Sequence, residues 1–207
     1  NLECVERFCY LGDMIGAGGG AEDAFRARTR CAWSKFRELA PILTSRGASL
    51  KVKGKVYKTC VQRTMVYGSE TWPMKKEDMQ RLERTEHMMV RWMCGVSLKN
   101  RISSDELKGR LGIEGIDEIV ERGRLRWFGH VERKPIANWV SACRGFVVAG
   151  TKSKGRSRKT WEECVKKDLN CRSLKAEMAQ DRSNWRGLIG GQRPTRAGME
   201  KKDVKRK

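Results

Sequence analysis

Residues 122–134, RGRLRWFGHVERK, combine the residue types with which proteins bind nucleic acid. Arginine and lysine side chains neutralise phosphates, and an exposed indole ring such as that of Trp127 can stack on a base. The alternative is that Trp127 and Phe128 anchor a hydrophobic core, because large aromatic side chains are usually buried. Both can hold if the segment is helical and its arginines face away from the core. Trp127 is therefore a candidate nucleic-acid-binding residue, together with three arginines of the same segment: Arg122, Arg124 and Arg126.

His130 in this segment is expected to cap a helix or to lie in the core. A zinc site is the alternative, since His130 could act with Cys143, Cys164 and Cys171, but their spacing matches no compact zinc finger or knuckle. The eight cysteines contain no CxxC pair, which favours reduced and mostly buried thiols. We predict neither a metal site nor another cofactor in this chain.

A second basic segment, KSKGRSRK, alternates charged and small residues. Such a segment can lie extended along a phosphate backbone or enter a narrow minor groove, and its glycine permits close approach. A solvated linker or a nuclear-import signal is the alternative, and neither excludes binding. The candidate residues here are Lys152, Lys154, Arg156, Arg158 and Lys159.

The overall charge agrees with these candidates. The chain has 45 basic and 25 acidic residues, a formal net charge of +20, and residues 150–207 alone hold 18 basic and 7 acidic residues. A protein this basic is expected to bind nucleic acid; an acidic partner or an anionic membrane is the weaker alternative, because no long basic amphipathic helix is evident. Spacing does not tell which of six further basic residues face a ligand: Lys51, Lys53, Lys55, Arg63, Arg91 and Arg101.

Motifs of the common enzyme classes are absent from the sequence. It contains no GxxxxGK[ST], HExxH or GxSxG, and neither His87 nor His130 has an evident nucleophile partner. GAGGG at residues 16–20 lacks the spacing of a dinucleotide-binding loop and is interpreted as a turn. Asp13 is the only acid in a predicted strand, whereas two-metal catalysis needs several. No apolar stretch is long enough to span a membrane. We therefore predict a binding module that is not an enzyme on its own and has no membrane partner.

The elements that must position these residues are mainly α-helical. Residues 5–15 are β-prone and predict a short hairpin before the Gly-rich turn. Apolar residues at helical spacing then predict a long helix over residues 21–45, which Pro41 kinks or ends early. A second helix carries Val52 and Cys60, and a third of about twenty residues lies between Pro73 and Gly95. Its methionine-rich face, Met79, Leu82, Met89 and Met93, is expected in the core.

Capping patterns predict the later helices. Ser103 with Glu106 and Thr160 with Glu163 each form a capping box, and a helix over residues 116–125 lies between them. We expect Ser173 to cap a last helix that includes Trp185 and Leu188. The polar, basic tail is predicted to be disordered.

Several motifs occur in one order along the chain. They are FCYLGDMI before the Gly-rich turn, VYGSETWPMKKEDMQRLERTEHMMVRWMCGV, RISSDELKGRLGI, RGRLRWFGHVER, and GRSRKTWEECVKKDL ending in DRSNWRGLI. Together they resemble the C-terminal part of the polymerase polyprotein of non-LTR (LINE-like) retrotransposons, over nearly the whole chain to about Gly190. The chain departs from that pattern at Ser157, where the family often has Pro, and follows it loosely over residues 135–150.

The resemblance implies a part for each region. FCYLG would end the reverse-transcriptase palm, with the backbone near Tyr10, Leu11 and Gly12 helping to hold the primer end. Residues 21–93 would be the thumb, which grips the primer–template duplex, and the remainder would bind RNA or target DNA. The catalytic Tyr-x-Asp-Asp box, the fingers and the endonuclease lie upstream in that family. The chain is thus expected to be a fragment without polymerase activity of its own, with Mg²⁺ expected only in the palm.

These expectations divide the chain into five parts. They are the palm hairpin and Gly-rich turn (1–20), a helical thumb-like bundle with the helices that follow (21–134), a linker and basic arm (135–159), a C-terminal helical pair (160–190) and a disordered basic tail (191–207). The implied partners are an RNA template, an RNA–DNA hybrid or target DNA, with the upstream palm and fingers, and the implied location is intracellular and nuclear. The alternative is a domesticated or stand-alone basic helical adaptor that binds a protein partner.

Overall fold

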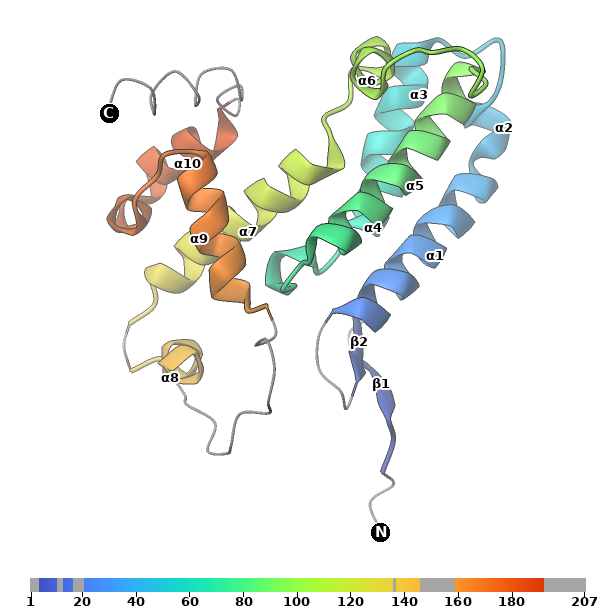
Figure 1. Ribbon diagram of the computed structural model, residues 1–207. Helices are drawn as coiled ribbons and strands as arrows, with labels where there is room; N and C mark the ends of the chain where they lie inside the picture. Colours follow the sequence, from blue (N-terminus) through green and yellow to red (C-terminus); the bar gives the residue numbers. More distant parts are fainter. Residues whose placement is uncertain (1–3, 11–12, 17–20, 136, 146–158, 192–207) are drawn as a thin grey trace, which may run out of the picture. The chain divides into compact units, whose positions relative to one another are not determined.

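The computed structural model describes residues 4–10, 13–16, 21–135, 137–145 and 159–191, and in them the chain is mainly α-helical (Figure 1). It divides into two compact units, Asn1–Val120 and Glu121–Lys207. The boundary lies within helix α7 (Ile116–Glu132), because Leu125 and Phe128 of this helix share a core with the helices that follow it. The predicted disordered tail, residues 192–207, and most of the basic arm lie outside the described residues.

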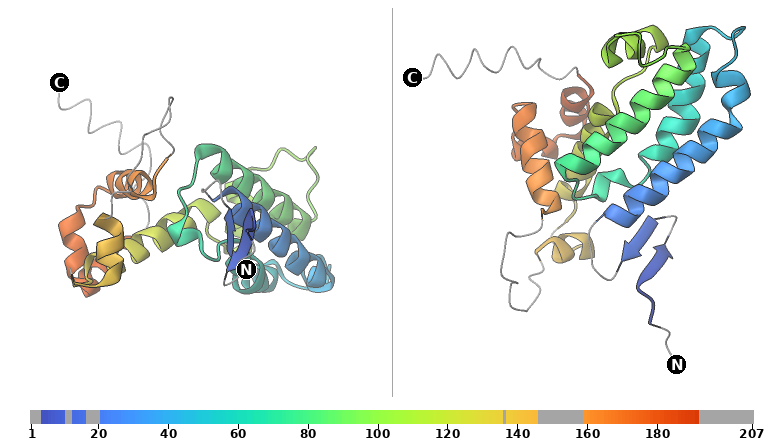
Figure 2. Two further views of the ribbon diagram at one scale, coloured as in Figure 1. Left: turned by 90° about the horizontal axis from the view of Figure 1, so that it is seen from below. Right: turned by 45° about the vertical axis from the view of Figure 1, so that its right-hand side comes forward.

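The predicted hairpin at the start of the chain is confirmed. Strands β1 (Arg7–Tyr10) and β2 (Asp13–Gly16) pair antiparallel, with Arg7 opposite Gly16 and Tyr10 opposite Asp13. Figures 1 and 2 place this hairpin beside the first turn of α1 (Glu22–Glu38). Every residue of β1 is exposed, so this strand contributes nothing to the core of the unit.

Pro41 ends the first long helix, as predicted. Helix α1 stops at Glu38, and α2 (Ala40–Leu43) begins with Pro41 in its first turn. Proline has no backbone N–H to donate and its ring is compatible with helix only in the first turn, so it starts a new helix here.

The next helical stretch is continuous from α3 (Leu50–Val56) through a π-helical segment, η1 (Tyr57–Gln62), to α4 (Arg63–Met65). Ser49 caps its start, since its hydroxyl accepts a hydrogen bond from the Val52 N–H. Gly54 permits a close approach, because a Cβ there would lie 1.9 Å from the carbonyl oxygen of Leu111. A short 3₁₀ turn, η2 (Ser69–Thr71), leads to the next long helix.

Helices α5 (Lys76–Cys94) and α6 (Ser104–Leu111) have the predicted ends. Gly95 and Gly112 follow them with φ of 64° and 65°, the left-handed conformation that glycine adopts without strain. The Ser103 hydroxyl accepts a hydrogen bond from the Glu106 N–H at the start of α6.

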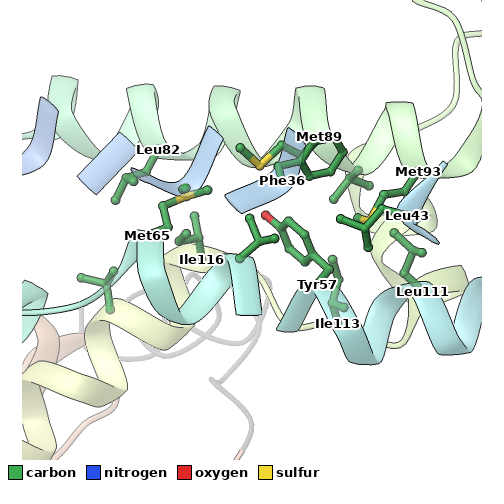
Figure 3. Close-up of a cluster of buried hydrophobic side chains, with 14 of the residues drawn as sticks. Phe36, Leu43, Tyr57, Met65, Leu82, Met89, Met93, Leu111, Ile113 and Ile116 are labelled. Atoms are coloured by element: carbon green, nitrogen blue, oxygen red, sulfur yellow. The ribbon is translucent and has the colours of Figure 1, made fainter. Parts of the chain in front are cut away.

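The first unit has one apolar core between α1, the α3–η1–α4 stretch and α5, which lie side by side in Figures 1 and 2. Figure 3 shows Tyr57 at its centre, surrounded by side chains from each of these helices. The methionine-rich face of α5 points into it as predicted: Leu82, Met89 and Met93 are buried and Met79 is partly buried.

The second unit consists of the end of α7, α8 (Trp139–Gly145), α9 (Trp161–Cys171), the 3₁₀ helix η3 (Ala176–Gln180) and α10 (Arg182–Gly190). The capping box of Thr160 and Glu163 at the start of α9 is confirmed. The expected helix capped by Ser173 is wrong. Ser173 has a φ of 54°, and α10 begins only after Asp181, whose carboxylate accepts hydrogen bonds from the N–H groups of Ser183 and Asn184.

The eight cysteines form no disulfide in the structure, and the expectation that most of them are buried is wrong. Only Cys164 is buried, while Cys4, Cys9, Cys31 and Cys143 are exposed. Cys4 precedes the hairpin, Cys9 lies in β1, and Cys31 and Cys143 lie on exposed positions of helices. No group of His, Cys, Asp and Glu side chains in the described part of the chain could hold a metal ion.

Candidate nucleic-acid interface

The second half of α7 is fixed by one buried face. Leu125 and Phe128 pack with Val165 of α9 and with Trp185 of α10 in the core of the second unit. The Trp185 Nε1–H donates a hydrogen bond of 3.0 Å to the carbonyl oxygen of Leu125. Gly129 is required beside this indole, because a Cβ there would lie 2.4 Å from Trp185 Nε1. These contacts determine which face of α7 is exposed.

The exposed face carries an aromatic pair beside a basic group. The Trp127 side chain is 36% exposed, and its ring stacks on that of His130, with centroids 5.3 Å apart and planes at 30°. Arg126 is exposed next to Trp127 and stands one helical turn before His130. We call Arg126, Trp127 and His130 the α7 face. The expectation that His130 is a core residue is wrong, because it is exposed and the buried side of the helix is occupied by Leu125, Phe128 and Gly129; it lies in the last turn of α7, and whether it caps the helix stays a prediction.

Other arginines of the segment contact groups within the protein and are less exposed than Arg126. Arg124 is buried and its Nη1–H donates to the Asp168 carboxylate at 2.6 Å. The Arg133 Nη1–H donates to the carbonyl oxygen of Ala179 at 2.6 Å. Arg122 is half-buried. Of the three predicted arginines in this segment, Arg126 is the exposed one.

Two buried ion pairs connect the elements of the unit that presents the α7 face. One joins Arg124 of α7 to Asp168 of α9, and the other joins Glu121 of α7 to Arg172, which follows α9. Arg172 also donates to the carbonyl oxygens of Ile189 and Gly191 and so holds the end of α10. Burial raises the pKa of Asp168, although the charge and hydrogen bond of Arg124 oppose the shift.

In the first unit, two of the predicted basic residues are buried. Lys53 donates from Nζ to the carbonyl oxygen of Met93 at 3.1 Å, and Arg91 donates to the carbonyl oxygens of Ser97, Asn100 and Ile102. Both therefore serve the fold and are not available to a ligand. The remaining predicted residues are exposed: Lys51, Lys55, Arg63 and Arg101, with Tyr10 on β1.

The basic arm is described only at its end. Lys152, Lys154, Arg156 and Arg158 lie outside the described residues, as do Leu11 and Gly12 of the hairpin. Lys159 is half-buried at the start of α9, and its charge acts on the Asp168 carboxylate.

The sequence interpretation missed the pairing of His130 with Trp127. Their separation of three residues on a predicted helix was a usable signal, because side chains at this spacing are neighbours on a helix surface. A search for helices that could span a membrane finds none among the described residues.

Comparison with known proteins points to a mobile genetic element. The chain is similar to an uncharacterized transposon-derived protein of Caenorhabditis elegans, with 24% identity over 200 residues that cover 91% of this chain and 71% of the relative. This similarity supports a transposon-derived origin for the chain. No protein-family model matches it, and no solved structure does.

Proposed function

We propose that the chain is the non-catalytic C-terminal part of a retrotransposon polymerase polyprotein and that it binds nucleic acid in the nucleus. The order of its motifs and its similarity to a transposon-derived protein support the origin. The observation that carries the binding function is the α7 face, where an exposed stacked ring pair lies beside an exposed guanidinium.

The α7 face has the two kinds of group that hold a polynucleotide without reading its sequence. The guanidinium of Arg126 can neutralise a phosphate, and the Trp127–His130 pair offers a ring surface on which a base of any identity can stack. In the first unit, Lys51 and Lys55 stand one helical turn apart on α3 and can contact successive phosphates of a primer–template duplex.

The hairpin fits the proposed place at the end of a palm. Phe8 is 54% exposed, Tyr10 55% and Ile15 56%, and their two strands pair with no further strand among the described residues. A two-stranded hairpin is marginally stable alone, so these exposed apolar side chains suit the extension of a larger sheet. We propose that the upstream palm supplies that sheet, together with the catalytic carboxylates and Mg²⁺.

The proposal is tested by binding of the whole chain to a labelled RNA–DNA hybrid at a series of salt concentrations. Affinity should fall by orders of magnitude between about 50 and 200 mM salt and should depend little on sequence, because phosphate contacts release counterions. An affinity that barely changes over this range would contradict the proposal.

A further inference from the structure

The end of α5 and the loop after it expose three large apolar side chains. Met88 is 58% exposed, Trp92 53% and Leu98 83%. They lie around a hollow of about 450 Å³ whose walls also include Arg91 and Val96. We call this site the Leu98 hollow. Exposed apolar side chains gathered at a concave site are a mark of interaction surfaces.

Polar contacts, not Leu98, hold the loop in place. Arg91 donates hydrogen bonds to three carbonyl oxygens of the loop, at Ser97, Asn100 and Ile102. The Asn100 side chain accepts from both the backbone N–H and the hydroxyl of Ser97, at 3.1 and 2.7 Å. The fold therefore gives Leu98, at 83% exposure, no packing role of its own.

The floor of the site is also fixed before any partner arrives. The ring centroids of Trp92 and Phe36 lie 5.5 Å apart, and Phe36 is fully buried in the core of the first unit. A partner would thus meet an ordered apolar surface and would lose little free energy in ordering it.

The charges around the Leu98 hollow are positive. Arg84 is exposed one helical turn before Met88, and Lys99 and Arg101 are exposed in the loop beside Leu98. Arg91 in the wall is occupied by carbonyl oxygens of the loop, so the charges available to a ligand are those of Arg84, Lys99 and Arg101. A ligand for this site should therefore combine apolar side chains with negative charge.

We propose that the Leu98 hollow docks an acidic amphipathic helix of a partner protein. Such a helix would place apolar side chains at i, i+3 or i+4, and i+7 against Met88, Trp92 and Leu98, with carboxylates facing the basic rim. Methionine adapts its shape to such anchors. Two of the three apolar side chains are aliphatic, which favours a protein partner, since nucleic acid gains chiefly by stacking its bases on aromatic rings.

The test is a selection from a display library of random peptides, each long enough for about four helical turns. The library is passed over the immobilised whole chain, and bound peptides are retained. Bound clones are then depleted on the Leu98→Glu variant. We expect enriched sequences with apolar residues at helical spacing and an excess of Asp and Glu. A synthetic copy, followed by fluorescence anisotropy, should bind L98E and M88E at least about tenfold more weakly than the unchanged chain.

The matched control is Leu188→Glu, at another exposed leucine, 37% exposed on α10, which should leave peptide affinity unchanged. L98E should melt at the same temperature as the unchanged chain, so a loss of binding is not a loss of folding. The proposal is overturned if no sequence is enriched over L98E, or if the enriched sequences carry no acidic excess.

A third overturning result assigns the site differently. If a single-stranded oligonucleotide displaces the peptide and L98E also loses oligonucleotide affinity, the Leu98 hollow is a nucleic-acid surface. The two proposals can fail independently. Nucleic-acid binding by the α7 face can be absent while the Leu98 hollow still binds the peptide.

Discussion

Trp127 is one of the exposed tryptophans of the second unit, and it is distinguished by the His130 ring stacked on it. Trp127→Ala should weaken binding of a single-stranded oligonucleotide by about 1–3 kcal/mol, because a base loses its stacking surface. Trp127→Phe should retain part of the affinity. Fluorescence anisotropy at constant salt measures both variants.

Trp139 on α8 provides the control, since it is 73% exposed and has no ring partner among the described residues. Trp139→Ala should bind the oligonucleotide as the unchanged chain does. Equal losses in the two alanine variants would mean that the α7 face has no specific role in stacking.

Gly129 and Gly123 on α7 offer a matched pair for stability. Gly129→Ala forces a methyl group to within 2.4 Å of Trp185 Nε1 and should cost about 1–3 kcal/mol by overpacking. Gly123→Ala meets no described atom within 4 Å and should stabilise the helix by up to about 1 kcal/mol. Urea denaturation followed by ellipticity measures both, and a neutral G129A would show that α10 can move away from α7.

At this scale the sequence could predict that residue 128 is buried, but not that Trp127 is exposed. Phe128 follows Leu125 at helical spacing and so shares its buried face, whereas the hydrophobicity of Trp127 suggests a core position that the structure does not give it. The sequence also could not separate Lys53, Arg91 and Arg124 from the exposed basic residues. Their burial depends on carbonyl oxygens and a carboxylate that are distant in sequence or lie in loops.

Helices α7 and α9 are joined by the buried pair of Arg124 and Asp168. Asp168→Ala leaves the guanidinium buried without its carboxylate and should cost about 3–5 kcal/mol. Replacing both residues by leucine should recover most of this loss, because the desolvation cost disappears with the charges. Urea denaturation of the two variants checks the pair, and a double variant no better than D168A would argue against this account.

Helices α5 and α7 and the η1 segment meet at the buried carboxylate of Glu86. It accepts hydrogen bonds from Gln62 Nε2 at 2.9 Å and from the N–H of Ile116 at 3.1 Å. Ile116 is the first residue of α7. Burial raises the pKa of Glu86 from its ordinary value near 4.5, although these hydrogen bonds and Lys108 oppose the shift.

This raised pKa predicts a pH dependence with a definite sign. The folded protein binds a proton at Glu86 more tightly than the unfolded chain does. Protonated Glu86 therefore contributes stability that is complete below pH 4.5 and is lost as pH rises through the raised pKa. Glu86→Gln cannot titrate, and its stability relative to the unchanged chain should therefore rise over this window. Urea denaturation at a series of pH values measures the difference, and a relative loss for E86Q would show that ionised Glu86 is stabilised in the fold.

Element boundaries were predictable where local chemistry determines them. Pro41, Gly95, Gly112 and the Thr160 cap all act through their own backbone or an immediate neighbour. The error at Ser173 is also local, because its positive φ does not suit an N-cap, residues 176–180 form a 3₁₀ helix, and Asp181 caps α10 instead. The sharing of α7 between two cores could not be predicted, since its apolar pattern is continuous.

The whole molecule carries a net charge of +20, but only its exposed part can bind phosphates. Arg126→Gln should reduce the slope of log affinity against log salt by about one, since one phosphate contact is lost. Lys53 is only 5% exposed, so Lys53→Met should leave the slope of log affinity against log salt unchanged. It should lower the melting temperature, because the buried side chain loses its hydrogen bond to Met93. Salt titrations of the two variants on one oligonucleotide distinguish exposed from buried charge, and equal slopes would exclude Arg126 from the contact.

The second unit combines a small apolar core with the two buried ion pairs of Glu121–Arg172 and Arg124–Asp168. Exposing apolar surface on unfolding raises the heat capacity, whereas exposing polar surface lowers it. Hydration of charged groups also becomes less favourable as temperature rises, which reduces the cost of keeping these pairs buried. The stability of this unit should therefore vary less with temperature than that of the first unit, whose core is formed by many more apolar side chains.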